Sequence, residues 1–145
     1  MPLTLKEIKG KLQNLERLRE LRREDFAEEG GYADSLAEDF RDNLKPTQLF
    51  KVFHEIKRVQ RRIRGNPDEK FDRGEILGLL PILAYSTGRG LMPKDFYDIL
   101  KICLSKEKLE INKDFLRLAE FMEAIIAYHK YYKYREATKG GSYGI

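Results

Sequence analysis

The sequence has one cysteine, Cys103, and no apolar run long enough to cross a membrane. A single cysteine excludes an intramolecular disulfide framework and is typical of a reducing compartment. The longest apolar stretch, residues 76–85, is interrupted by Gly78 and Pro81 and is far shorter than the roughly 20 residues of a membrane span. No N-terminal stretch has the pattern of a secretory signal. We therefore expect a soluble, cytoplasmic protein without a membrane partner.

Patterns that support catalysis or hold a cofactor are also missing. The two histidines, His54 and His129, form no zinc-ligand spacing with each other or with Cys103. The segment "STGRG" follows a helical stretch and lacks the strand and the lysine of a phosphate-binding P-loop. Nucleophile-elbow and triad patterns are absent as well. The sequence therefore predicts a protein that is not an enzyme and has no catalytic residue, metal or cofactor.

Strand alternation and hairpin signals are absent, whereas nearly every stretch has helical periodicity. Thr4 and Glu7 have the spacing of a helix-capping box. A stripe of leucine and isoleucine, from Leu5 to Leu15, follows it; this stripe either packs within its own domain or forms a seam for a partner. The chain of 145 residues is long enough for one domain. We expect an all-α fold, a compact bundle of about five helices over residues 1–135, followed by a flexible C-terminal tail over residues 136–145.

The apolar stretch over residues 76–90 predicts the most buried helix of the bundle, because its apolar residues lie on all sides of the helical wheel. Pro81 is expected to kink this helix, and Gly88 and Gly90 are expected to end it.

Acidic side chains are concentrated over residues 24–42, where eight of them stand against the single Arg41. Such a segment is either a solvated surface or a region that repels nucleic acid and so confines it to another face.

Basic side chains are concentrated in the next helix, predicted over residues 46–64, where Glu55 is the only acid. One third of its wheel is apolar, and Lys51, Arg58, Arg61 and Arg62 lie opposite, with Lys57 at the flank. Like charges at i,i+4 destabilise a helix by about 0.2–0.5 kcal/mol per pair. A bound polyanion relieves that repulsion and releases counterions. The alternative is an ordinary solvated face.

The last helix places His129 in the centre of its apolar stripe, which favours a core position over a catalytic or metal-binding one. Tyr128, Tyr131, Tyr132 and Tyr134 follow, interleaved with Lys130, Lys133 and Arg135. Tyrosines of this kind either pack at the rim of the core or contact nucleic acid by stacking.

Three blocks, "LKPTQLFKVFHEIKRV", "LLPILAYSTGR" and "FLRLAEFMEAIIAYHKYY", resemble in this order the small subunit of the type III-A CRISPR effector, the Csm complex, which serves antiviral defence. The similarity covers roughly residues 40–133. Phe50 stands where the family usually has an arginine, and Ile82 stands where a lysine often precedes "LAY". The resemblance implies a small helical subunit without catalytic activity, several copies of which stack along a ribonucleoprotein. Its implied partners are the guide RNA, the single-stranded target RNA, other subunits and further copies of itself.

The candidate nucleic-acid-binding residues come from both lines of reasoning. The matching blocks carry over Lys51, Lys57, Arg58, Arg89 and Lys130. Arg61 and Arg62 are added by periodicity alone. The alternative function is a structural helical adaptor that acts only through protein contacts, by the Leu5–Leu15 stripe and the tyrosines of residues 128–134.

Overall fold

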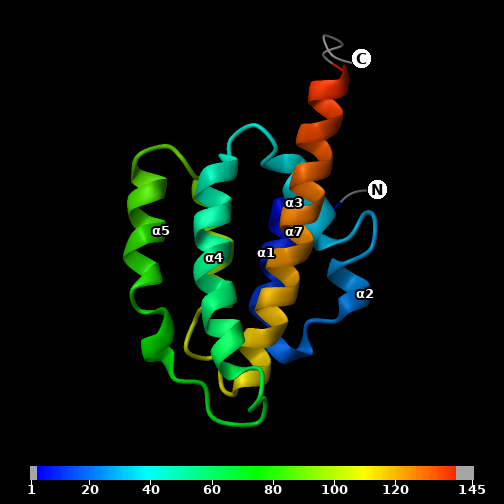
Figure 1. Ribbon diagram of the computed structural model, residues 1–145. Coiled ribbons are helices and arrows are strands. Elements are labelled where there is room, and N and C mark those ends of the chain that lie inside the picture. Colours follow the sequence, from blue (N-terminus) through cyan, green and yellow to red (C-terminus); the bar gives the residue numbers. More distant parts are fainter. Residues whose placement is uncertain (1–2, 140–145) are drawn as a thin grey trace.

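The computed structural model describes residues 3–139, with side chains up to residue 136. Helices joined by loops make up this part of the chain (Figure 1). In chain order the elements are α1 (Leu5–Asn14), the 3₁₀ helix η1 (Leu18–Glu20), α2 (Arg23–Phe26), α3 (Tyr32–Asp39), α4 (Pro46–Ile63), the 3₁₀ helix η2 (Arg73–Ile76), α5 (Leu79–Gly88), α6 (Lys94–Cys103) and α7 (Asn112–Lys139). The described residues contain no strand, only one isolated β-bridge between Lys70 and Ile111. The all-α prediction is confirmed: residues 3–139 form seven α-helices in a single helical domain, rather than about five.

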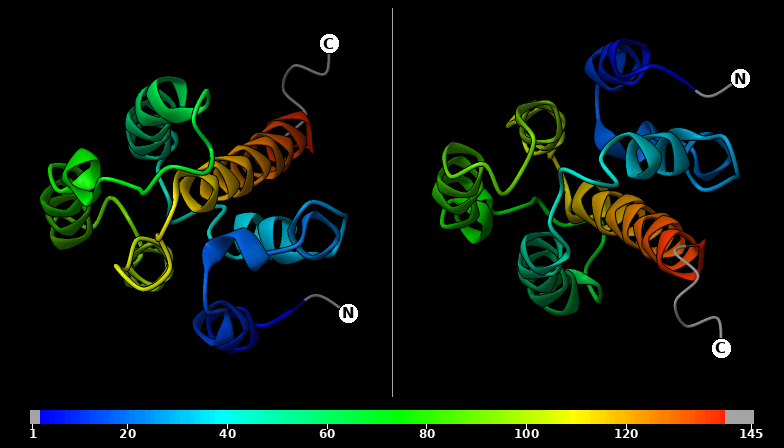
Figure 2. Two further views of the ribbon diagram at one scale, coloured as in Figure 1. Left: turned by 90° about the horizontal axis from the view of Figure 1, so that it is seen from below. Right: turned by 90° about the horizontal axis from the view of Figure 1, so that it is seen from above.

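Helix α7 runs through the middle of the bundle, and the other elements surround it (Figures 1 and 2). It packs against α3, α4, α2 and η1. Helices α3 and α4 lie on opposite flanks of α7, and α1 and α6 pack together on the side opposite α4 (Figure 2). The α7 helix continues through residues 136–139, and the remainder of the tail predicted over 136–145 lies outside the described residues.

Helix α1 begins at the predicted capping box. The Thr4 hydroxyl accepts a hydrogen bond from the Glu7 backbone at 3.1 Å, and the Glu7 carboxylate accepts one from the Thr4 backbone at 3.1 Å. Ile8 and Leu12 are fully buried, and α1 packs against α6. The apolar stripe of α1 therefore packs within its own domain. The buried Ile8 and Leu12 are not available to a partner helix.

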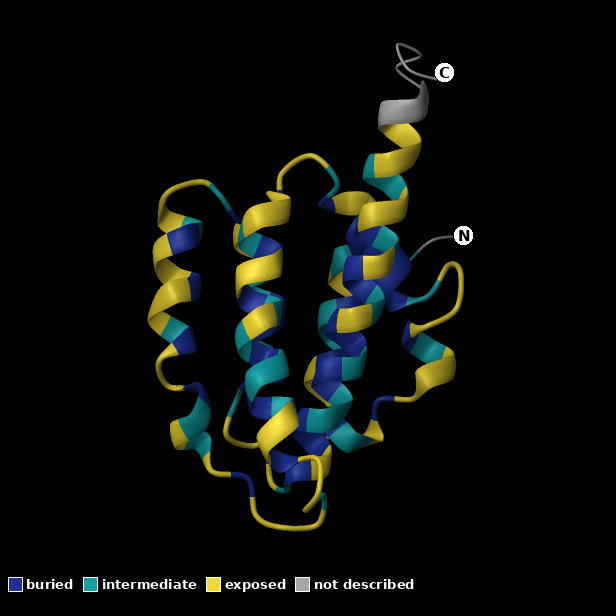
Figure 3. Ribbon diagram, viewed as in Figure 1, coloured by how far each residue is buried: buried dark blue, intermediate teal, exposed yellow. Residues whose placement is uncertain are grey.

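Helix α5 is not the most buried helix, and this expectation was wrong. It packs only at the edge of the bundle, against α4 and α6, so that its outer side faces solvent (Figure 3). Leu77, just before it, is 53% exposed, and Ile82 and Tyr85 within it are 36% and 65% exposed. Pro81 does not kink the helix, because α5 begins only at Leu79 and places the proline in its first turn, where a missing backbone N–H costs little.

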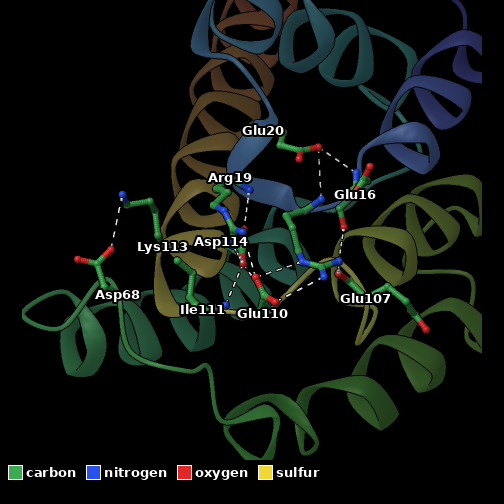
Figure 4. A network of polar contacts seen from close by, with 10 residues as sticks. Glu16, Arg19, Glu20, Asp68, Glu107, Glu110, Ile111, Lys113 and Asp114 are labelled. Atoms are coloured by element: carbon green, nitrogen blue, oxygen red, sulfur yellow. Dashed lines mark hydrogen bonds and ion pairs between the residues drawn. The ribbon is translucent and has the colours of Figure 1, made fainter.

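Asp114 is the centre of a polar cluster at the start of α7, which we name the Asp114 corner and define as Arg19, Glu110 and Asp114 (Figure 4). The Asp114 carboxylate is fully buried and accepts backbone hydrogen bonds from Arg19 at 2.8 Å and from Glu110 and Ile111 at 2.9 Å each. The Arg19 guanidinium donates to Asp114 and to Glu110, each at 3.0 Å. The corner therefore joins η1 to the first turn of α7.

Cys103 lies in the core at the end of α6 and is fully buried. Burial disfavours the thiolate and raises the pKa of Cys103 to about 12. The thiol therefore stays protonated at neutral pH. Among residues 3–139, no group of three or more side chains is arranged to hold a metal ion, and no helix is long and apolar enough to span a bilayer.

Candidate nucleic-acid interface

Helix α4 has the boundaries and the buried face that its sequence predicts. Pro46 occupies its first position, where proline is favoured, and the extended backbone of Lys45 precedes it. The buried residues recur every three or four positions and are Leu49, Val52, Ile56, Val59 and Ile63. Because this stripe packs on α7 and α5, the opposite side of α4 faces solvent (Figure 3).

One margin of the exposed side of α4 faces α5. Lys51 is exposed and, together with Arg89 at the end of α5, lines a groove of about 360 Å³ between the two helices. Further along α4, the Arg62 guanidinium lies 3.4 Å from the Glu75 carboxylate in η2, although the Arg62 side chain remains 62% exposed.

The other margin of α4 faces α7. The ammonium of Lys130 lies 5.0 Å from the centroid of the Phe50 ring, which is 41% exposed. The Lys57 ammonium lies 3.5 Å from the Glu123 carboxylate of α7 and 5.6 Å from the ring centroid of its own neighbour Phe53. Phe50 is thus partly exposed and lies beside a cation of α7.

The seven predicted residues divide into two sets by their charged neighbours. Lys57, Arg58 and Arg62 each have a carboxylate within 4.0 Å, from Glu123, Glu55 and Glu75. In the described part of the chain, no ion pair involves the second set, which comprises Lys51, Arg61, Arg89 and Lys130. All four of these are exposed. The structure therefore places Lys51 and Arg61 on α4, Arg89 directly after α5 and Lys130 on α7. These four are the less neutralised members of the predicted site.

The four tyrosines of α7 differ in how far they are exposed. The Tyr128 hydroxyl donates to the Ala27 carbonyl at 2.8 Å, and the Tyr132 hydroxyl donates to the Asp34 carboxylate. Burial is the main cause that raises the pKa of Tyr132, with the Asp34 carboxylate adding to it. Tyr131 and Tyr134 are 54% and 74% exposed. Rim packing is therefore confirmed for Tyr128 and Tyr132, which join α7 to the acidic segment.

His129 is a core residue, as its position in the apolar stripe predicts, and is 2% exposed. Its Nε2 atom is buried and has no hydrogen-bond partner in the described structure. Burial is the main cause that lowers the pKa of His129, and the nearby backbone of Leu44 and Phe40 opposes this only in part. The imidazole is therefore neutral at pH 7.

The sequence profile of the Csm2 Type III-A family matches residues 23–135. The chain belongs to this family. As a Csm2 family member it is a small subunit of the type III-A CRISPR complex, and it assembles with other subunits of that complex. The family is a structural one within the complex. No curated protein and no solved structure matches the sequence significantly.

The family match spans all seven candidate residues, from Lys51 to Lys130, and leaves α1 outside it. Two further residues at this surface were not among the sequence candidates. Tyr85 lies in the stretch that was expected to form the most buried helix, yet it lines the same groove as Lys51 and Arg89. Glu75 was not considered at all, because nothing in the local sequence pairs η2 with the end of α4.

Proposed function

We propose that this Csm2 family subunit binds the backbone of guide and target RNA without sequence specificity, through the exposed side of α4 and the neighbouring residues Arg89 and Lys130. Several copies stack along the complex, and the subunit itself has no catalytic activity. It acts in the cytoplasm, as part of the assembled ribonucleoprotein. Guide pairing then supplies the sequence specificity, by analogy with other RNA-guided effectors.

The observation that supports this proposal most strongly is a set of exposed cations that form no ion pair within the described residues: Lys51, Arg61, Arg89 and Lys130. A cation that already has a surface ion pair must exchange that carboxylate for a phosphate, whereas a cation without an ion pair keeps its full charge for the phosphate and releases counterions. Their contribution to binding should therefore exceed that of the three paired cations of α4.

The test compares two matched variants that each remove three positive charges. One carries Lys51→Gln, Arg61→Gln and Lys130→Gln, and the other carries Lys57→Gln, Arg58→Gln and Arg62→Gln. A third variant, Lys6→Gln, Lys11→Gln and Lys101→Gln, removes the same charge from α1 and α6 on the opposite side. Affinity for single-stranded RNA is measured by fluorescence anisotropy over a series of salt concentrations.

The unpaired-set variant should lose the most affinity, and its salt slope should fall by about 2, since each phosphate contact contributes about 0.7 on a single strand. The paired-set variant should lose less, and the α1–α6 variant should bind almost as the parent does. If all three variants lose RNA affinity equally, binding depends on net charge alone, and the assignment of the RNA-binding surface to α4 is wrong.

The alternative is a structural adaptor that acts only through protein contacts. The exposed apolar residues Leu77, Ile82 and Tyr85 at the α5 edge are the observation that favours it. Deleting residues 1–23 cannot test a partner seam on α1, because the deletion also removes the buried Ile8, Leu12, Leu18 and Leu21. A Leu77→Asp variant is the better probe. Loss of self-association by light scattering, with unchanged RNA affinity in the α4 variants, would favour the adaptor.

A further inference from the structure

A groove between α4 and α5 combines apolar walls with two cations. Helix α5 contributes Pro81, Ile82 and Tyr85, and α4 contributes Lys51. Arg89, the last of these residues in the chain, follows α5 directly. The groove has a volume of about 360 Å³, which lies at the lower end of the range for small-molecule sites. A larger cavity of about 830 Å³ lies beside the Asp114 corner, but Arg17 and Glu110 in its lining are already paired with each other.

Tyr85 is held in place without being covered. The Arg89 guanidinium carbon lies 5.7 Å from the centroid of the Tyr85 ring, and an Arg89 nitrogen donates to the Tyr85 hydroxyl at 3.3 Å. The side chain nonetheless keeps 65% of its surface exposed. With Ile82 beside it, Tyr85 presents an apolar surface to water at a place where no described part of this chain covers it.

Two features of the groove select the kind of ligand that fits it. The flat ring of Tyr85 and the side chains of Pro81 and Ile82 suit a flat, largely apolar group. Lys51 and Arg89 have no carboxylate neighbour in the described residues, so an anionic group beside that flat group would be attracted. A nucleotide joins a flat base and a phosphate in this way, and aromatic rings hold unpaired bases by stacking.

We propose that this groove is a subsite for one unpaired nucleotide of single-stranded RNA. The base stacks on Tyr85 against Ile82 and Pro81, and the adjoining phosphates contact Lys51 and Arg89. This proposal depends on the proposed RNA-binding function of α4, and it adds a position at which the subunit holds a base as well as the backbone. Every base has a π face, so the subsite tolerates any sequence, with purines held more tightly than pyrimidines because they stack over a larger area.

The first experiment separates the ring of Tyr85 from its hydroxyl. Tyr85→Ala should weaken binding of a fluorescent single-stranded oligoadenylate of about ten nucleotides by at least about fivefold. Tyr85→Phe keeps the ring and should bind as the parent does. Leu77→Ala is the matched control, because it removes an exposed apolar side chain from the same edge outside the groove lining. Thermal melts should show all three variants folded, since both positions are exposed.

The second experiment asks whether the base itself is held. An RNA duplex of the same length offers phosphates but no unpaired base, so Tyr85→Ala should leave duplex affinity unchanged. The chain contains no tryptophan, so Tyr85→Trp introduces a single indole reporter. Its fluorescence should be quenched by oligoadenylate and scarcely changed by the duplex.

Four results would overturn the subsite. Unchanged single-strand affinity in Tyr85→Ala, together with a loss in the Lys51, Arg61 and Lys130 variant, would remove the subsite and leave the proposed function standing. Equal losses for single strand and duplex would show that the ring supports backbone binding only. Unchanged RNA affinity with impaired assembly of the reconstituted complex would identify the groove as a protein-docking site. If the three-cation variant also bound RNA as the parent does, the proposed function would fail together with the subsite.

Discussion

The Asp114 corner and the exposed side of α4 are both rich in charge, yet they use it in different ways. At the corner, a fully buried carboxylate is surrounded by three backbone N–H groups and a guanidinium. On α4, the ion pairs are longer, at 3.3–3.5 Å, and their side chains remain partly exposed. Charge that is buried and fully hydrogen-bonded determines how the chain folds. Charge that stays in water contributes little to folding and remains available to a ligand.

The largest effect should come from removing the centre of the corner. Asp114→Ala leaves three backbone donors and the Arg19 guanidinium without their acceptor, and it should lower the free energy of unfolding by about 3–5 kcal/mol. Urea denaturation followed by circular dichroism measures this loss. Asp114→Asn keeps an acceptor oxygen and should lose less. If Asp114→Ala lowers the free energy of unfolding by less than about 1 kcal/mol, the charged groups of the corner stabilise the fold no more than the surface ion pairs of α4 do.

His129 extends the comparison to a buried polar side chain, whose Nε2 atom has no hydrogen-bond partner among the described residues. Its pKa is lowered in the folded protein, so the unfolded chain binds the proton more tightly. Its contribution to stability is therefore full above the unfolded pKa of about 6.5 and is lost as the pH falls from there toward the folded pKa, by at most about 1.4 kcal/mol per pH unit.

The check is a set of urea denaturation curves between pH 7 and pH 5. His129→Leu cannot titrate and should lose less stability over this range than the parent. His54→Gln, which removes the other histidine from the exposed side of α4, should retain the pH dependence of the parent. If the free energy of unfolding falls with pH equally in the parent and in His129→Leu, the pH dependence does not come from His129.

The smallest effect should be the coupling between Arg62 and Glu75. A double-mutant cycle with Arg62→Ala and Glu75→Ala measures it, and we expect no more than about 1 kcal/mol, decreasing with added salt. The same cycle for Arg19 and Asp114 should give a larger coupling that salt reduces less. Similar values for the two pairs would remove the distinction between the two regions.

The sequence was sufficient for the parts of the molecule that local periodicity determines. The spacing of Leu49, Val52 and Ile56 placed the buried side of α4 and therefore its exposed side. The same reasoning placed His129 in the core, and the spacing of Thr4 and Glu7 located the start of α1.

Features that depend on pairing between distant residues could not be predicted. Arg19 and Asp114 are 95 positions apart, and Arg62 meets Glu75 only because η2 folds back beside α4. The failure at α5 has a similar origin. The apolar residues of a helical wheel indicate how much surface the helix could bury, but not how many other helices pack against it. In the described structure, α5 packs mainly against α4 and α6. Tyr85 was missed as a candidate ligand contact for that reason.

The enclosed Cys103 has a practical consequence for work on the assembled complex. Maleimide dyes and cross-linkers attack thiolates, so a thiol that is sealed in the core and has a pKa of about 12 does not react in the native protein. A cysteine introduced at the exposed Lys6 of α1, on the side opposite α4, would therefore be the single labelling position of the native subunit. Distances between copies, or between one copy and a labelled RNA, can therefore be measured by spectroscopy without first replacing Cys103.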